Sequence, residues 1–132
     1  MTEVPLISIV DDDDLLRTAV EKLVRSLGYT ACTFASAGEY LQSSLVKTTR
    51  CLIVDVQMPN MNGLELQEQL AQMGFDIPII FLTAYPDDAI KARALNKGAI
   101  CFLQKPLDLQ GRRLVDCLQQ ALDRRSGPAT TT

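Results

Sequence analysis

The chain has 132 residues, of which 47% are hydrophobic and 22% are charged. These values are typical of one soluble globular domain and exclude intrinsic disorder for most of the chain. The formal net charge of −3 argues against direct nucleic-acid binding by these residues. No apolar run approaches the roughly 20 residues that cross a bilayer, and the N-terminal residues resemble neither a signal peptide nor an anchor. We therefore expect a cytoplasmic protein without a membrane segment.

Histidine and cysteine usage narrows the possible chemistry further. The chain contains no histidine, which excludes histidine-based catalysis and histidine-ligated zinc. The four cysteines lack the close spacing of a metal site, and most of them lie in apolar, strand-like runs. They are Cys32, Cys51, Cys101 and Cys117. We predict that all four are reduced, small core residues in a reducing cytosol.

Short apolar runs alternate along the chain with longer stretches of helical periodicity. In chain order, the pattern predicts a strand at 6–10, a helix at 16–27, a strand at 30–34, a helix at 37–44, a strand at 51–54, a helix at 64–73, a strand at 78–82, a helix at 87–97, a strand at 99–103 and a helix at 114–122. Glycines at 28, 74 and 98 are expected to end three of these helices.

Strict alternation of strands and helices predicts an α/β fold with a parallel sheet covered by helices on both faces. Right-handed crossovers favour a doubly wound, five-stranded sheet with strand order 2-1-3-4-5. We expect one domain over residues 1–125. Residues 126–132 contain no apolar residue larger than alanine and are predicted to form a flexible tail or the start of a linker.

Polar residues stand at the carboxyl ends of four predicted strands, where ligands bind in doubly wound sheets. Asp11 and Asp12 follow the first strand, Asp55 the third, Thr83 the fourth and Lys105 the fifth. Three acids and one lysine sum to a charge of −2, which a divalent cation would neutralise. Oxygen ligands without histidine or cysteine suit Mg²⁺, and a phosphoryl group can then approach the site. Asp55 would act as the nucleophile and form an acyl phosphate.

The same residues lie in motifs that resemble a known family. These motifs are VDDD at 10–13, LIVDVQMPNMNGLEL at 52–66, FLTA at 81–84 and FLQKP at 102–106. They look like the receiver domain of bacterial two-component response regulators, in the CheY-like superfamily. The resemblance runs in order over residues 6–122, and it is strongest to the FixJ-like and NarL-like groups.

The resemblance implies a role for each acidic residue. Asp55 matches the phosphoacceptor. Asp12 and Asp55 match the direct Mg²⁺ ligands, Asp11 matches a ligand that acts through water, and the backbone carbonyl of Gln57 matches a further protein ligand. Mg²⁺ is therefore the expected cofactor.

The resemblance also implies a switch. Thr83 matches the hydroxyl that turns toward the phosphoryl group, and Lys105 matches the ammonium that pairs with it. The bond between Lys105 and Pro106 is cis in the family, whereas ordinary X-Pro bonds are cis only about 5% of the time. Phe102 matches the aromatic residue that fills the space behind the moving threonine, so that phosphorylation would reshape the face formed by the last two helices and the last strand.

The expected function is that of a signalling module rather than an enzyme, one that catalyses only its own phosphorylation and dephosphorylation. The expected partners are a sensor histidine kinase or phosphotransfer protein, a second copy of the chain, and an output domain, such as a DNA-binding one, or partner protein. Five basic residues in the last third of the chain form either a solvated surface or a dimerisation or partner face: Lys91, Arg93, Lys97, Arg112 and Arg113.

Three other functions stay open. A haloacid-dehalogenase-like phosphatase also uses an aspartate nucleophile and Mg²⁺, but it needs a second acid where this chain has Gln57. A flavodoxin-like cofactor binder shares the topology, but its first loop would be rich in serine, threonine and glycine rather than aspartate. A degenerate receiver would act only as a protein-interaction module, although all five chemical positions are present.

Overall fold

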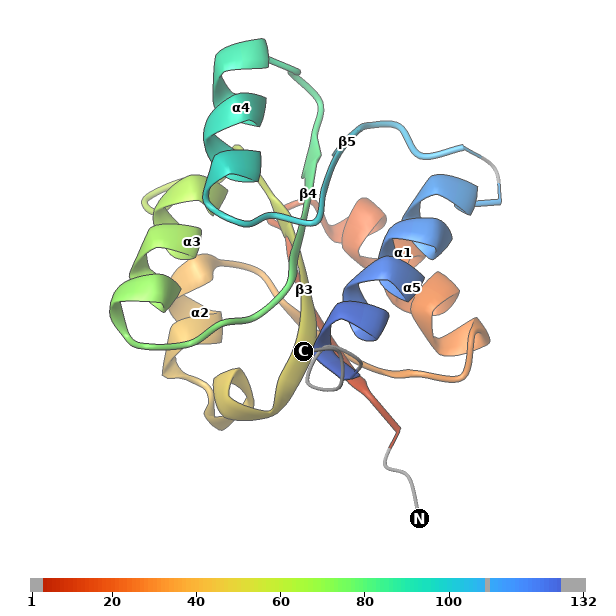
Figure 1. Cartoon of the computed structure of the whole chain (residues 1–132). Coiled ribbons are helices and arrows are strands. Elements are labelled where there is room, and N and C mark those ends of the chain that lie inside the picture. Colours follow the sequence, from red (N-terminus) through yellow and green to blue (C-terminus); the bar gives the residue numbers. More distant parts are fainter. Residues whose placement is uncertain (1–3, 109, 127–132) are drawn as a thin grey trace.

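The computed structural model describes the backbone of residues 4–108 and 110–126 and the side chains of these ranges up to residue 123. A parallel five-stranded sheet has the order β2-β1-β3-β4-β5, which confirms the predicted topology (Figure 1). The elements in chain order are β1 (Leu6–Val10), α1 (Asp14–Ser26), β2 (Thr30–Phe34), α2 (Ala37–Gln42), the 3₁₀ helix η1 (Ser44–Thr48), β3 (Thr49–Asp55), α3 (Gly63–Gln72), β4 (Ile79–Thr83), α4 (Asp88–Asn96), β5 (Cys101–Gln104) and α5 (Arg112–Ser126).

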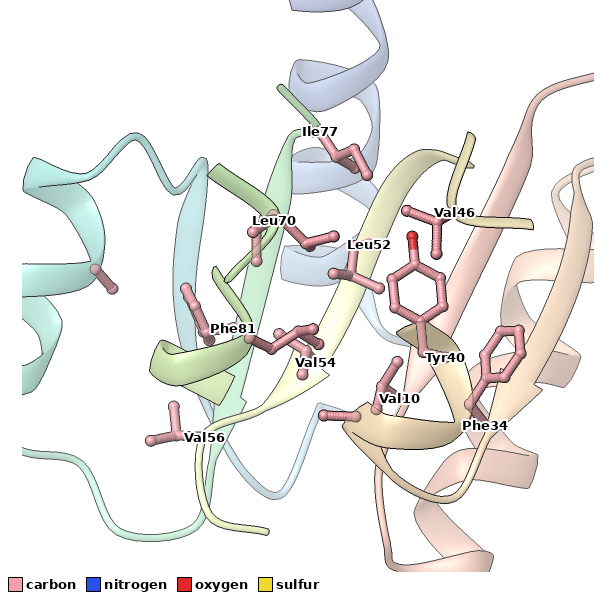
Figure 2. Close-up of a cluster of buried hydrophobic side chains, with 14 residues drawn as sticks. Val10, Phe34, Tyr40, Val46, Leu52, Val54, Val56, Leu70, Ile77 and Phe81 are labelled. Carbon is pink, nitrogen blue, oxygen red and sulfur yellow. The ribbon is translucent and has the colours of Figure 1, made fainter. Parts of the chain in front are cut away.

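Helices cover both faces of the sheet because the central strands are apolar on both faces. In β3, Leu52 and Val54 pack into the core cluster beneath α2, α3 and α4 (Figure 2). The alternate residues Cys51 and Ile53 pack into a second cluster beneath α1 and α5. This arrangement leaves the carboxyl ends of the strands open, so residues that follow the strands meet at one edge of the sheet.

Side-chain caps set where the helices begin. The Asp13 carboxylate accepts hydrogen bonds from the backbone N–H groups of Leu15 and Leu16 and so starts α1 directly after the acidic loop. Asn62 and Glu65 form a reciprocal capping box at the start of α3. The loop that follows β3 is therefore anchored at its far end.

The structure differs from the predicted elements in the segment between α2 and β3. The helix predicted at 37–44 ends at Gln42, and the 3₁₀ helix η1 that follows it was not predicted. Ser43 accepts a hydrogen bond from the Leu45 N–H, and the buried Thr49 donates its hydroxyl proton to the Leu45 carbonyl. These bonds favour a 3₁₀ turn and carry β3 two residues further toward its N-terminal end than periodicity indicated.

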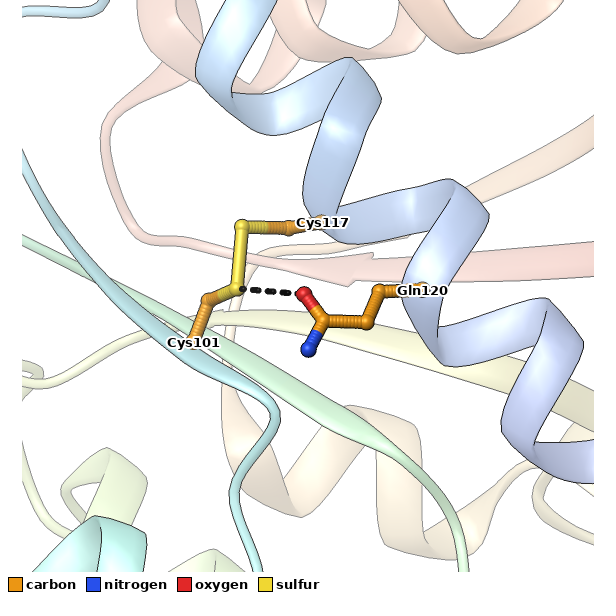
Figure 3. Close-up of a disulfide and its surroundings, with 3 residues drawn as sticks. All are labelled: Cys101, Cys117 and Gln120. Atoms are coloured by element: carbon orange, nitrogen blue, oxygen red, sulfur yellow. Dashed lines mark hydrogen bonds between the residues drawn. A yellow bond between two sulfur atoms is a disulfide. The ribbon is translucent and has the colours of Figure 1, made fainter.

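The prediction that all four cysteines are reduced is wrong for one pair. Cys101 in β5 and Cys117 in α5 form a disulfide (Figure 3), and this bond does not include Cys32 or Cys51. The packing of α5 on the sheet brings the Cα atoms of Cys101 and Cys117 to 6.2 Å, a distance that a disulfide spans. Their separation of 16 residues carries no such signal in the sequence.

The last helix runs into the segment that was predicted to be a tail. The α5 helix includes Ser126, the first residue of the predicted tail, and residues 127–132 lie outside the described residues. Across the described ranges, no helix has the length and apolar character required to cross a membrane.

Candidate functional site

Four strands direct polar side chains to the same edge of the sheet. Asp11 directly follows β1, Asp55 is the last residue of β3, Thr83 is the last residue of β4, and Lys105 directly follows β5. Because β1 pairs with both β2 and β3, this edge is also the point where the strand order reverses. The structure thus brings the sequence-predicted residues into one neighbourhood.

Lys105 lies between two buried carboxylates. Its Nζ atom is 3.2 Å from Oδ2 of Asp11 and 3.2 Å from Oδ2 of Asp55. The other oxygens of these carboxylates accept backbone hydrogen bonds, from Asp13 N–H to Asp11 and from Gln57 N–H to Asp55. Each carboxylate is therefore oriented by its own loop and presents one oxygen to the lysine.

The pKa directions follow from this geometry. Burial, the largest effect, raises the pKa of both Asp11 and Asp55, and the charge of Asp11 raises that of Asp55 further. Lys105 lowers both, but not enough to reverse the shift. Burial also lowers the pKa of Lys105, yet the two carboxylates outweigh it and leave the lysine pKa raised. Lys105 thus stays charged and partly neutralises the acids.

Asp12 completes a cluster of carboxylates. One carboxylate oxygen from each of Asp11, Asp12 and Asp55 lies within 4.8 Å of the others, and Asp12 is exposed at the mouth of the site. Three acidic oxygens at this separation, two of them from buried residues, match the hard ligands that Mg²⁺ takes. The residues present therefore fit a divalent cation.

Thr83 is buried and its hydroxyl already has partners. The hydroxyl donates a hydrogen bond of 2.8 Å to the side-chain carbonyl oxygen of Gln57 and accepts one of 3.1 Å from the Tyr85 N–H. The sequence predicted a metal ligand at the Gln57 backbone carbonyl but did not predict this side-chain contact. Nothing in the sequence marks the contact, because the two residues are 26 positions apart.

Strand β5 contains Phe102 and leads directly into Lys105 of the site. The Lys105 N–H donates a 2.7 Å hydrogen bond to the Thr83 carbonyl, and the Lys105–Pro106 peptide bond is cis. Phe102 is half-buried, and its ring centroid lies 6.1 Å from that of Phe81 in β4. The ring therefore has apolar support on one side and solvent on the other.

The basic residues singled out in the sequence lie on the surface. Lys91, Arg93, Lys97, Arg112 and Arg113 are all exposed. Lys97, the C-cap residue that follows α4, forms a 3.0 Å ion pair with Glu68 in α3, which lowers the pKa of Glu68. The exposure of these five basic side chains fits a solvated surface and is also compatible with a surface that contacts a partner.

Comparison with known proteins identifies the class that this fold and site define. Residues 7–119 match the family model of the response regulator receiver domain, and the chain belongs to this family. It is a receiver domain of two-component response regulators, a signalling module rather than a classical enzyme.

Individual relatives agree with this assignment. The chain is 38% identical over 119 residues to Nodulation protein W of Bradyrhizobium diazoefficiens, covering 90% of this chain and 52% of that protein. It is 40% identical over 114 residues to the transcriptional regulatory protein TdiR of Thauera aromatica, covering 86% and 49%. Among solved structures, the response regulator StyR matches 97% of this chain and 66% of its own, with 38% identity and a TM-score of 0.85. The chain spans about half the length of these two curated relatives.

Proposed function

We propose that Asp55 is the residue that receives a phosphoryl group. The observation that carries this proposal is the position of its Oδ2 atom, 3.2 Å from the Lys105 ammonium and within a cluster of three carboxylates at the open edge of the sheet. A carboxylate in this position can act as a nucleophile, and the adjacent cation compensates the charge that accumulates during transfer.

The acidic cluster would hold Mg²⁺. Asp11, Asp12 and Asp55 supply carboxylate oxygens, and the backbone carbonyl of Gln57 is the further ligand that the family resemblance implies. When bound, the cation supplies positive charge that lets a phosphoryl group enter a site that three carboxylates would otherwise make repulsive.

The transfer itself needs only a carboxylate oxygen and a donor. An Asp55 oxygen forms a bond to phosphorus as the bond between phosphorus and the imidazole nitrogen of a phosphohistidine breaks, and the imidazole keeps the electron pair of that bond. Lys105 remains protonated throughout, since its pKa is raised. The products are an acyl phosphate on Asp55 and a neutral histidine on the donor after it gains a proton from water.

Phosphorylation would then be converted into a change of surface. The new phosphoryl oxygens compete with Gln57 for the Thr83 hydroxyl, and Phe102 moves into the space behind Thr83. The affected surface is the face of α4, β5 and α5. On this proposal the domain covers residues 1–125 and works in the cytoplasm. A histidine kinase or phosphotransfer protein phosphorylates it, and the switched face controls an output domain or a homodimer.

Phosphorylation by acetyl phosphate tests the assignment. With Mg²⁺ present, the wild-type chain should give one retarded band on a phosphate-affinity gel, which hydroxylamine should remove because it cleaves acyl phosphates. Asp55→Asn should give no such band, and a chelator should abolish the band of the wild-type chain. The matched control is Asp13→Asn, which keeps an asparagine cap on α1 and should be phosphorylated normally.

The same assay separates the alternatives. A retarded band in Asp55→Asn that equals the wild-type band would refute the assignment of Asp55. Sustained hydrolysis of p-nitrophenyl phosphate would favour the phosphatase, and a folded chain that accepts no phosphate would favour the degenerate receiver.

A further inference from the structure

The disulfide joins two elements of the face that the proposed switch would reshape. Cys101 is the first residue of β5, and Cys117 lies in the middle of α5 (Figure 3). Gln120, one turn further along α5, places its side-chain oxygen 3.9 Å from the Cys101 sulfur. The cross-link therefore ties the edge strand of the sheet to the helix that covers it.

The cross-link acts on the strand that carries the switch residues. Side chains alternate along β5, so Cys101 packs toward α5 and its cluster of Leu114 and Leu118, whereas Phe102 packs against the opposite cluster with Phe81. Lys105 follows directly after the end of the same strand. A covalent bond at Cys101 thus restrains the backbone next to Phe102 without occupying the space into which the ring would move.

The two cysteines differ in access to solvent. Cys101 is half-buried, whereas Cys117 is only 6% exposed. A small reagent would therefore reach Cys101 first, and Cys117 would resolve the product from within the core. The pairing is selective, because the disulfide joins Cys101 to Cys117 and does not include Cys32 or Cys51.

We propose that Cys101 and Cys117 form a reversible redox site and that their oxidation restrains β5 against α5 and weakens the response of the α4–β5–α5 face to phosphorylation. The proposal rests on the proposed function. A domain of this size buries enough surface to fold without a disulfide, and disulfides in reducing compartments are commonly redox-sensing. A cross-link favours whichever conformation keeps the two Cα atoms within its reach, and so opposes a conformation that separates them.

The oxidant is a low-molecular-weight disulfide such as oxidised glutathione. The Cys101 thiolate attacks one sulfur of the oxidant, forming a mixed disulfide and releasing one glutathione thiolate. The Cys117 thiolate then attacks the Cys101 sulfur and releases the second glutathione. Two cysteine thiols are oxidised, one glutathione disulfide is reduced to two thiols, and the two protons pass to the released glutathione.

Thiol counting tests whether the pair forms. The full chain is equilibrated in glutathione buffers, quenched and labelled with N-ethylmaleimide in denaturant so that buried thiols also react, and weighed by mass spectrometry. Four labels are expected in reducing buffer and two in oxidising buffer, with a peptide map that links Cys101 to Cys117. Four labels under every buffer, or a link that uses Cys32 or Cys51, would overturn the proposal.

A second measurement tests the coupling. Beryllofluoride with Mg²⁺ serves as the phosphoryl mimic, and the resonance of ¹⁹F-labelled Phe102, identified with Phe102→Leu, reports the switch. The fraction of switched molecules should be about threefold smaller in the oxidised chain than in the reduced chain. Cys101→Ser should respond like the reduced chain in both buffers, and Cys117→Ala serves as a second variant without the link. Cys32→Ser is the matched control and should keep the redox dependence.

The outcomes separate this proposal from the proposed function. If acetyl phosphate modifies Asp55 in both redox states and the switched fractions are equal, the redox proposal fails while the proposed function stands. If Asp55 is modified in neither state, the proposed function fails and the coupling fails with it. The thiol count then still decides whether the cysteines pair.

Discussion

The hydroxyl of Thr83 donates a 2.8 Å hydrogen bond to the side chain of Gln57, two residues after Asp55. The Tyr85 N–H donates to the same hydroxyl oxygen, so both directions of hydrogen bonding at this group are in use. Thr83 can donate to a phosphoryl group on Asp55 only after its bond to Gln57 breaks. Gln57 therefore opposes the switched conformation by about the strength of one hydrogen bond, roughly 0.5–1.5 kcal/mol.

Gln57→Met should ease this step, because methionine has a similar length and accepts hydrogen bonds only weakly. We expect the fraction of switched molecules at subsaturating beryllofluoride to rise by about two- to tenfold, measured from the Phe102 resonance. In a Thr83→Val background the same substitution should have no effect. Equal gains in both backgrounds would show that Gln57 acts by another route.

Lys105→Met should destabilise the fold, because it leaves Asp11 and Asp55 buried without their shared cation. We expect a loss of roughly 3 kcal/mol in the free energy of unfolding at neutral pH in the absence of Mg²⁺, measured by urea denaturation. Lys97→Met, which breaks only the exposed pair with Glu68, should leave the free energy of unfolding nearly unchanged.

The deficit of Lys105→Met should depend on pH. Both aspartates have folded-state pKa values raised above 3.8, so the folded chain binds more protons than the unfolded chain as the pH falls toward that value. Protonation removes the repulsion between the carboxylates, and the deficit should therefore narrow on acidification. If Lys105→Met loses the same free energy of unfolding at neutral pH and at a pH close to 3.8, the electrostatic explanation is contradicted.

Gly63 lies where no larger residue fits. A Cβ atom at this position would lie 2.5 Å from the Asp55 carbonyl oxygen and 3.0 Å from the Phe81 ring. Gly63→Ala should lower the free energy of unfolding by about 1–3 kcal/mol and reduce phosphorylation of Asp55, because the backbone that carries the carboxylate must shift. Gly38→Ala is the control, since a Cβ in α2 meets no atom within 4 Å and should be neutral or slightly stabilising.

The Tyr40 hydroxyl belongs to a buried hydrogen-bond network. It donates to Thr49, whose own proton goes to the Leu45 carbonyl, so Ser8 must also donate to Thr49. Tyr40→Phe keeps the ring packing but removes one of these bonds, and should cost about 1 kcal/mol in urea denaturation. Tyr85→Phe, at a side chain that is 73% exposed, should leave stability unchanged within about 0.5 kcal/mol.

Alkaline titration gives an independent check of this network. Burial raises the pKa of Tyr40 above its ordinary value of 10.0. The protonated Tyr40 hydroxyl stabilises the folded chain fully below its ordinary pKa of 10.0. This stabilisation is lost as the pH rises through the higher pKa of the folded state. Between about pH 9 and about pH 11, wild type should therefore lose more stability than Tyr40→Phe. Parallel losses in the two proteins would show that the hydroxyl does not titrate as the structure indicates.

Local patterns in the sequence predicted the order of the elements and the strand topology. The continuous apolar run at 51–54 is typical of a strand covered on both faces, and Gly28 ends α1 where the helical periodicity stops. Asp11, Asp55 and Lys105 were placed near one another because the carboxyl ends of parallel strands share an edge. These predictions needed only spacing and residue type.

Contacts that leave no periodic signal in the sequence escaped the same reasoning. η1 depends on the bond from Thr49 to Leu45, and a buried hydroxyl gives no periodic signal. The Cys101–Cys117 disulfide depends on the distance and the relative position of α5 and β5, and the helical period of the sequence specifies neither.

By itself, the sequence determined the order of the strands and helices, where the chain turns and which acids stand at the strand ends, because these properties depend on neighbours along the chain. Tertiary structure alone decided that Lys105 would lie 3.2 Å from both Asp11 and Asp55, that Thr83 would donate to Gln57 and that two of the four cysteines would pair. Such contacts depend on ångström-scale packing between elements, and that packing is settled only when the whole core is assembled.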